Sequence, residues 1–94
     1  MMTDELAPRE LNLLRAIQKH WDAHGYAPSL RTLNDELNFR STSVVRYYVL
    51  KLEAHRLLHV PRDPYGTMLA HTIKLTPLGY ATYIESKTQE EPLT

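Results

Sequence analysis

The segment of residues 39–52, FRSTSVVRYYVLKL, carries two stripes of side chains at helical spacing, and both contain apolar residues. The first stripe consists of Val45, Tyr48, Val49 and Leu52. The second lies one step round the same helix and consists of Ser43, Arg46, Tyr47 and Leu50. A helix on the surface of a small domain needs only one apolar stripe to join the core. The first stripe is the more apolar, so we expect it to face inward and the second to face solvent or a partner.

Length and composition exclude several classes of protein. The chain has 94 residues, which is enough for one domain with one modest core. It contains no cysteine, which excludes disulfides, zinc–cysteine sites and thiol nucleophiles and is compatible with the reducing cytoplasm, where we expect the protein. No apolar run approaches the roughly 20 residues that a membrane helix requires, and the acidic N-terminus does not resemble a secretory signal.

The charges are balanced overall but are unevenly distributed. Eleven basic residues oppose eleven acidic ones, whereas residues 40–62 hold five basic residues against the single Glu53, a local balance of +4. Both ends of the chain are net negative. A basic centre between acidic ends fits a domain that presents one face to a polyanion, and scattered surface charge is the alternative explanation.

The first half of the chain predicts three helices. Pro8 and Gly25 are suited to the start and the end of a helix over residues 8–24, whose apolar stripe includes Ile17 and Trp21. A short second helix over 30–37 follows Ser29, which can cap it, and ends before Asn38. The third helix is expected over 42–54, with Ser41 as its cap.

After residue 54 the pattern changes to short extended runs, 57–60 and 72–75, separated by a loop rich in proline. This pattern predicts a β-hairpin over 57–75. Pro77 then begins a last helix over 77–86, and residues 87–94 are expected to form a flexible tail. The whole is a mainly α (α+β) fold in one domain, residues 1–85: a winged helix-turn-helix with a three-helix core, a wing and an extra C-terminal helix.

Residues 6–60 resemble the N-terminal DNA-binding domain of LexA-type repressors. The matching residues are Leu6, Pro8-Arg9, Ile17, Gly25-x-x-Pro28-Ser29, Leu37-x-Phe39-Arg40-Ser41 and Leu52-Glu53. The resemblance implies a transcription regulator, a repressor by family, whose third helix recognises double-stranded DNA. In this family a self-cleaving peptidase domain begins where this chain ends, so we do not expect self-cleavage.

Two departures from the family pattern bear on structure. Asn38 stands where the family usually has glycine, which is a mild change. His55-Arg56 stand where the family often has Lys-Gly, so Arg56 is expected in an uncomfortable backbone conformation or in a rebuilt corner. The exposed side chains of the third helix also differ from those of the family, so the target sequence is expected to differ from the LexA operator.

The candidate DNA contacts follow from the position of the third helix. Base contacts are expected from Ser43, Val44, Arg46 and Tyr47, with Arg46 first because its guanidinium can donate two hydrogen bonds to guanine. Phosphate contacts, which set position without reading sequence, are expected from Arg31, Arg40, Ser41, Lys51 and Arg62. Helix capping by Ser41 and ordinary packing of Tyr47 are the structural alternatives.

Other functions find less support in the sequence. The residues offer no enzyme motif and no cofactor loop, and His20 and His24 share a helix face without the further ligand that a metal site needs. The rival hypothesis is a winged-helix protein-interaction module, favoured by the zero net charge and by Tyr47 and Leu50. Residues 73–86, IKLTPLGYATYIES, resemble the helix that pairs subunits in dimeric MarR and PadR regulators, so a homodimer through this helix is an open alternative to simple packing on the first helix.

Overall fold

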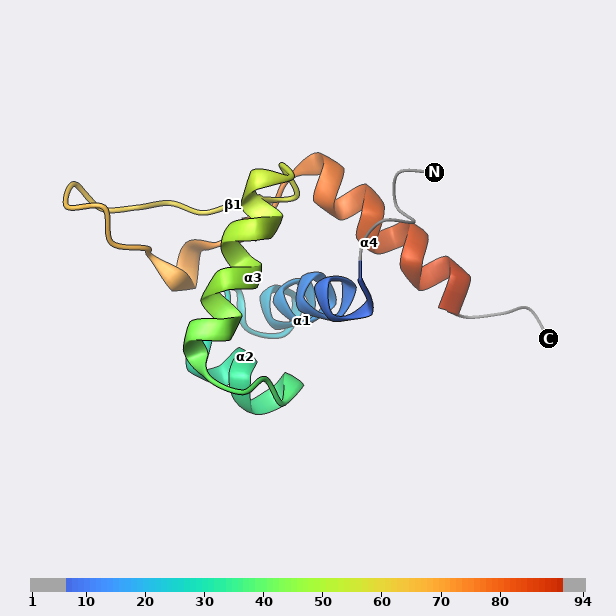
Figure 1. Cartoon of the computed structure of the whole chain (residues 1–94). Coiled ribbons are helices and arrows are strands. Elements are labelled where there is room, and N and C mark those ends of the chain that lie inside the picture. Colours follow the sequence, from blue (N-terminus) through green and yellow to red (C-terminus); the bar gives the residue numbers. More distant parts are fainter. Residues whose placement is uncertain (1–6, 91–94) are drawn as a thin grey trace.

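The computed structural model describes residues 7–90 and confirms a winged helix-turn-helix with an added C-terminal helix (Figure 1). Its elements are α1 (Pro8–His24), α2 (Leu30–Leu37), α3 (Thr42–Ala54), β1 (Leu58–His59), the short 3₁₀ helix η2 (Ala70–Thr72), β2 (Lys74–Leu75) and α4 (Pro77–Glu90). Helix α3 crosses α1, and the loop of the hairpin extends away from the helices on one side of the molecule (Figure 1).

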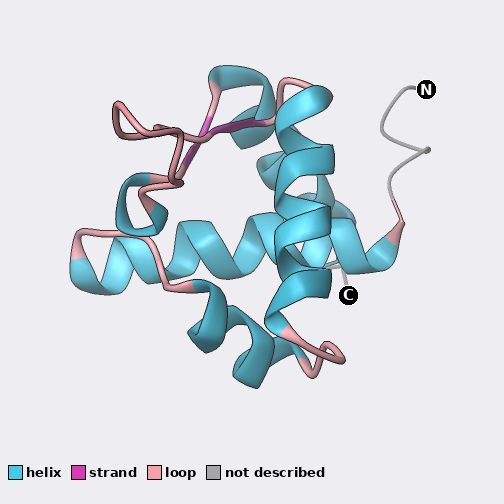
Figure 2. Cartoon of the chain, turned by 60° about the vertical axis from the view of Figure 1, so that its left-hand side comes forward, coloured by secondary structure: helices cyan, strands magenta, loops and turns pink. Residues whose placement is uncertain are grey.

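The core lies where α1, α2 and α3 meet the base of the hairpin (Figure 2). Val45, Val49 and Leu52 of α3 are fully buried, and Tyr48 of the same stripe is half-buried against them. The more apolar stripe therefore faces inward, as its composition predicts. Trp21 joins the helices to the hairpin, because its indole Nε1–H donates a 2.7 Å hydrogen bond to the carbonyl oxygen of Ile73.

The two helix starts around the turn are built differently. Ser29 caps α2, since its hydroxyl oxygen accepts a 3.0 Å hydrogen bond from the backbone N–H of Thr32. Ser41 occupies the corresponding position before α3, but its side chain makes no capping hydrogen bond, so the predicted hydroxyl cap is wrong. The backbone of Ser41 is almost fully extended, with φ −164°, whereas φ at Ser29 is −72°. We attribute the missing cap to this difference in backbone angle.

The wing has shorter strands than the sequence predicts. Leu58 pairs with Leu75 and His59 with Lys74 in an antiparallel register. Thr72 was expected in the second extended run but lies in η2 instead. Its backbone N–H and its hydroxyl both donate to the carbonyl oxygen of Leu69, at 3.0 and 2.8 Å, and this local turn replaces strand pairing.

Helix α4 is longer than predicted. The apolar stripe ends near residue 86, which is why a tail was expected from residue 87, but the helix continues to Glu90. The sequence contains no glycine or proline between Tyr80 and Pro92, so no residue in that segment interrupts the backbone hydrogen bonding. The last four residues of the expected tail, 91–94, lie outside the described residues.

Arg56 follows α3 in the left-handed region, with φ 65°, which confirms the strain expected from its place in the family pattern. A side chain with a Cβ atom is disfavoured there and glycine is not. We expect Arg56→Gly to stabilise the protein by about 0.5–1 kcal/mol, measured as a rise in Tm of a few degrees. Arg56→Ala keeps the Cβ and is the matched control, for which no comparable rise is expected. Equal rises for both variants would show that the arginine side chain, not the backbone, is the source of strain.

Candidate nucleic-acid interface

Most of the residues predicted to contact bases lie on the outer face of α3. Ser43, Arg46 and Tyr47 are all exposed, and the side chain of Tyr47 is 58% exposed. Val44, the fourth residue predicted to contact a base, is half-buried and packs against the core, so little of its side chain is exposed to a partner. One helix therefore holds an inward apolar stripe and an outward stripe of polar and aromatic residues, which is the arrangement a recognition helix requires.

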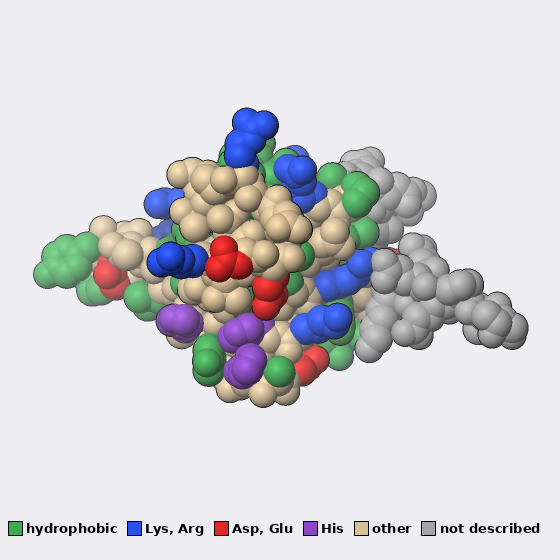
Figure 3. Space-filling model, turned by 90° about the horizontal axis from the view of Figure 1, so that it is seen from below, with side chains coloured by type: hydrophobic (Ala, Val, Ile, Leu, Met, Phe, Trp, Pro, Cys, Tyr) green, Lys and Arg blue, Asp and Glu red, His purple; other side chains and the backbone are tan. Residues whose placement is uncertain are grey.

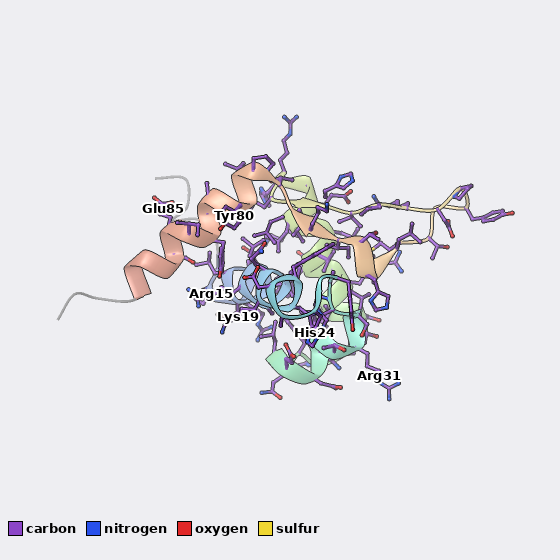
Figure 4. The ribbon with its side chains drawn as sticks, turned by 180° about the vertical axis from the view of Figure 1, so that it is seen from behind. Arg15, Lys19, His24, Arg31, Tyr80 and Glu85 are labelled. Carbon is purple, nitrogen blue, oxygen red and sulfur yellow. The ribbon has the colours of Figure 1, made fainter. Side chains whose placement is uncertain are left out.

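Two of the residues predicted to contact phosphates lie at the N-terminal end of α3. Arg40 is exposed in the turn before the helix, and the hydroxyl of Ser41 is not used as a cap. The first backbone N–H groups of a helix attract anions, so this end suits a phosphate. Arg31 is also exposed, and its side chain projects from α2 into solvent (Figure 4).

Lys51 is already paired within the protein. Its ammonium lies 2.8 Å from Oε2 of Glu10, a carboxylate that is only 2% exposed. The other carboxylate oxygen, Oε1, accepts a 3.0 Å hydrogen bond from the N–H of Ala7, the residue before α1. Burial raises the pKa of Glu10, but Lys51 and the Ala7 N–H together outweigh it and hold that pKa below its usual value. The pair ties the start of α1 to the recognition helix.

Arg62 is also paired, at the base of the wing. Its two terminal nitrogens donate to the two carboxylate oxygens of Glu53, each at 2.8 Å, and one of them also donates to the carbonyl oxygen of Val60 at 3.0 Å. The hydrogen bond from Arg62 lowers the pKa of Glu53. Glu10 and Glu53 lie in other segments of the chain than Lys51 and Arg62, respectively. The sequence alone therefore does not predict these two ion pairs.

The tip of the wing is an ordered turn with an aromatic residue at its end. Oδ1 of Asp63 accepts hydrogen bonds from the backbone N–H groups of Tyr65 and Thr67, at 2.9 and 2.8 Å. Gly66 takes a φ of 87°, which closes the turn. The side chain of Tyr65 is 92% exposed, so it is the most prominent group that the wing presents.

Histidine side chains gather on the underside of the molecule (Figure 3). The rings of His20 and His24 lie 4.3 Å apart between centroids, and Tyr26 lies between them and His71. Nδ1 of His20 donates to the carbonyl oxygen of Tyr26 at 2.8 Å. Among the side chains that the structure describes, no three histidine, cysteine or acidic groups lie together so as to hold a metal ion. Within residues 7–90, no helix is long and apolar enough to cross a membrane.

The Glu10–Lys51 pair predicts a loss of stability in acid. A pKa lowered by folding adds stability above the ordinary carboxyl pKa of about 4.3, and this is lost as the pH falls through the lower folded-state value. We expect Glu10→Gln to lower the free energy of unfolding by about 2 kcal/mol at pH 7 and by progressively less toward pH 3. Denaturant unfolding across this range measures the difference. Glu36→Gln, on the exposed side of α2, is the control, and a pH-independent difference for Glu10→Gln would contradict the proposed role of the pair.

Residues 3–59 match the family model of the LexA DNA binding domain. The chain is 40% identical to the LexA repressor of Finegoldia magna over 63 residues, which cover 67% of this chain and 29% of that protein. It is 39% identical to the LexA repressor of Roseiflexus sp. over 56 residues, which cover 60% of this chain and 26% of that protein. The chain thus spans less than a third of the length of these repressors.

Solved structures share the fold over nearly the whole chain. BpsR of Bordetella bronchiseptica, whose structure concerns regulation of its DNA binding by 6-hydroxynicotinic acid, superposes with a TM-score of 0.68 at 26% identity. That match covers 93% of this chain and 57% of BpsR. A glycine-to-lysine mutant of MepR from S. aureus gives a TM-score of 0.74 at 14% identity, over 96% of this chain and 62% of that one.

The family match covers more than half of the chain and contains α1, the turn between α2 and α3, and the outer face of α3. The exposed residues Ser43, Arg46 and Tyr47 therefore lie on the recognition helix of a winged-helix domain. The chain belongs to the LexA DNA-binding domain family.

Proposed function

We propose that the protein binds double-stranded DNA at specific sequences through α3 and represses transcription by occupying its operator. The observation that carries the proposal is the outer stripe of α3, where Ser43, Arg46 and Tyr47 are exposed and Leu50 is half-buried, while Val45, Val49 and Leu52 of the other stripe are fully buried. An α-helix exposed in this way fits the major groove of B-form DNA. The family match and the repressors among the relatives support the same function.

Arg46 is the side chain best suited to read sequence. It is exposed, and no ion pair holds its guanidinium in the described part of the chain. A guanidinium that donates to guanine O6 and N7 contributes about 1–3 kcal/mol of discrimination. Ser43 would donate to or accept from a base edge, Tyr47 would contact a phosphate or sugar, and Val44 would reach a thymine methyl only through its exposed portion.

Contacts to the DNA backbone divide into two groups. Arg31, Arg40 and Ser41 are available to phosphates as they stand. Lys51 and Arg62 would first have to leave Glu10 and Glu53 or share their hydrogen bonds with them. We therefore propose that Arg31, Arg40 and Ser41 make the principal backbone contacts and that Lys51 makes a secondary one.

The salt dependence of duplex binding tests this function against a protein-interaction module. Neutralising several phosphates makes the logarithm of affinity fall with the logarithm of salt concentration, with a slope of about −0.9 for each phosphate. We expect a slope of about −2 to −3 from the residues named above. Fluorescence anisotropy with a labelled duplex measures it. A flat response, or no binding at low salt, would favour the interaction module, with Tyr47 on its contact surface.

We also propose that α4 pairs two copies of the chain. Its inner side is buried, at Thr82, Tyr83 and Ser86, while Leu78 and Ile84 are 55% and 39% exposed. Tyr80 of the same helix is 48% exposed (Figure 4). Operators with two-fold symmetry commonly reflect dimers.

Sedimentation analysis of the wild-type chain and of Leu78→Glu tests the pairing. Leu78 lies in the first turn of α4, where an acidic residue is compatible with the helix dipole, so the variant is expected to fold. A dimer that becomes a monomer in the variant supports the proposal. A wild-type chain that stays monomeric at micromolar concentration, also with DNA bound, contradicts it.

A further inference from the structure

We infer that Glu53 and Arg62 form a positioning pair that holds the wing against the recognition helix, and that Arg62 does not act as a phosphate contact. The inference rests on the proposed DNA binding for its effect on affinity, but the position of the wing can be measured without DNA. Arg62 is the only basic residue of the wing loop 61–70, and its charge alone would suggest a contact with DNA.

The geometry of the pair is that of a structural contact. A guanidinium and a carboxylate with two parallel hydrogen bonds of 2.8 Å hold each other in a fixed plane, which a single ammonium contact does not. Glu53 belongs to the last turns of α3, and Arg62 lies at the start of the extended loop of the wing. The further hydrogen bond from Arg62 to Val60 anchors the guanidinium to its own strand as well.

The second arm of the wing is held from the side of α1, because Ala27 N–H donates to the carbonyl oxygen of His71 at 3.0 Å and Trp21 donates to Ile73. Fewer contacts join the outer loop of the wing to α3. The strands β1 and β2 pair over only two residues each, at the base of the hairpin. Beyond them, the bridge between Arg62 and Met68 and the hydrogen bond from Leu69 N–H to Pro61 carbonyl join the two arms of the loop to each other, not to α3. The loop then runs away from the helices (Figure 1). Among the residues that the structure describes, the Glu53–Arg62 pair is therefore the polar link between this loop and α3.

The charges of the wing agree with this role. Arg62 and Asp63 are the only charged residues in 61–70. The first is bound by Glu53, and the second holds the backbone of the tip. The tip of the wing consequently presents the exposed Tyr65 and no unpaired cation to a partner. The contribution of the wing to DNA binding therefore depends on the position in which the Glu53–Arg62 pair holds the wing.

The two roles of Arg62 predict different results in DNA binding. If Arg62 positions the wing, Arg62→Ala weakens binding by about threefold to tenfold with little change in the salt slope. If Arg62 contacts a phosphate, the same variant reduces the steepness of that slope by about 0.9. The exchange variant Glu53→Arg/Arg62→Glu keeps the net charge and the pair, so positioning predicts recovery of most of the affinity. Arg62→Lys keeps the charge but not the two-bond geometry, and is expected to recover little.

A distance measurement without DNA tests the position directly. The chain contains no cysteine, so nitroxide labels can be attached at Thr67→Cys on the wing and Ala23→Cys on α1, both exposed positions. We expect a narrow distribution of distances that broadens in Arg62→Ala and in Glu53→Ala and narrows again in the exchange variant. Glu36→Ala removes a carboxylate elsewhere and is the control.

The outcomes separate this inference from the proposed function. An unchanged distribution in Arg62→Ala would overturn the inference, whatever the protein does with DNA. A reduced salt slope in that variant would overturn it in favour of a phosphate contact. A broadened distribution in a protein that binds no duplex would support the control of the wing by Glu53 and Arg62 and reject the proposed function.

Discussion

Gly79→Ala is expected to destabilise the protein by about 3 kcal/mol and to lower Tm by roughly 10 °C or more. Gly79 is buried in the first turn of α4, and a Cβ atom there would overlap the backbone carbonyl oxygen of Leu57. That oxygen cannot move freely, because it accepts a 3.1 Å hydrogen bond from the N–H of Thr76. The hydroxyl of Thr76 in turn donates to Arg56 carbonyl at 2.7 Å and accepts from Gly79 N–H at 2.9 Å.

The close approach of α4 to the start of the wing therefore depends on glycine at this position. Thermal and denaturant unfolding of Gly79→Ala measure the cost. Gly66→Ala is the matched control: Gly66 has φ 87° but no atom within 4 Å of an added Cβ, so only backbone strain of about 1 kcal/mol is expected. Equal losses in the two variants would mean that α4 does not pack on Leu57 as described.

Arg46→Ala is expected to produce the largest loss of DNA affinity among single substitutions on α3. Removing a guanidinium that donates twice to guanine costs about 1–3 kcal/mol, or roughly 5-fold to 150-fold in Kd. The loss should be larger on the preferred duplex than on unrelated duplexes, because a base contact contributes to specificity and a phosphate contact does not. Arg46 is exposed, so Tm is expected to change by little.

A matched control for Arg46→Ala removes one positive charge elsewhere. Lys19 lies on α1, is exposed, and is seen from the back of the molecule beside Arg15 (Figure 4). Lys19→Ala should reduce affinity slightly and equally for all duplexes, through the general electrostatic attraction alone. If Arg46→Ala behaved in the same way as Lys19→Ala, α3 would not be the element that reads sequence.

The parts of the structure that the sequence predicts are those set by neighbouring residues. The ends of α2 follow from Ser29 and Asn38, whose roles depend on the local backbone, and the inward stripe of α3 follows from helical spacing. The resemblance to the LexA family also pointed to Arg56 as the site of strain, which the left-handed φ confirms. In each case the information lies within a few residues of the feature.

The parts that the sequence does not predict depend on contacts between distant segments. Lys51 and Arg62 look like free cations in the sequence, and only the packing of α3 against α1 and the wing brings Glu10 and Glu53 to them. Gly79 shows no special pattern until Leu57 is placed against it. The predicted hydroxyl cap at Ser41 is wrong, and the backbone angle that we hold responsible is not visible in the sequence.

The most direct test of sequence-specific DNA binding is selection of bound duplexes from a random pool at about physiological salt. We expect one enriched motif that differs from the LexA operator, with inverted repeats if α4 pairs two copies. We also expect that Arg46→Ala loses preference at one guanine of that motif. A pool that shows no enrichment with the wild-type protein would contradict the central claim that the outer face of α3 reads DNA.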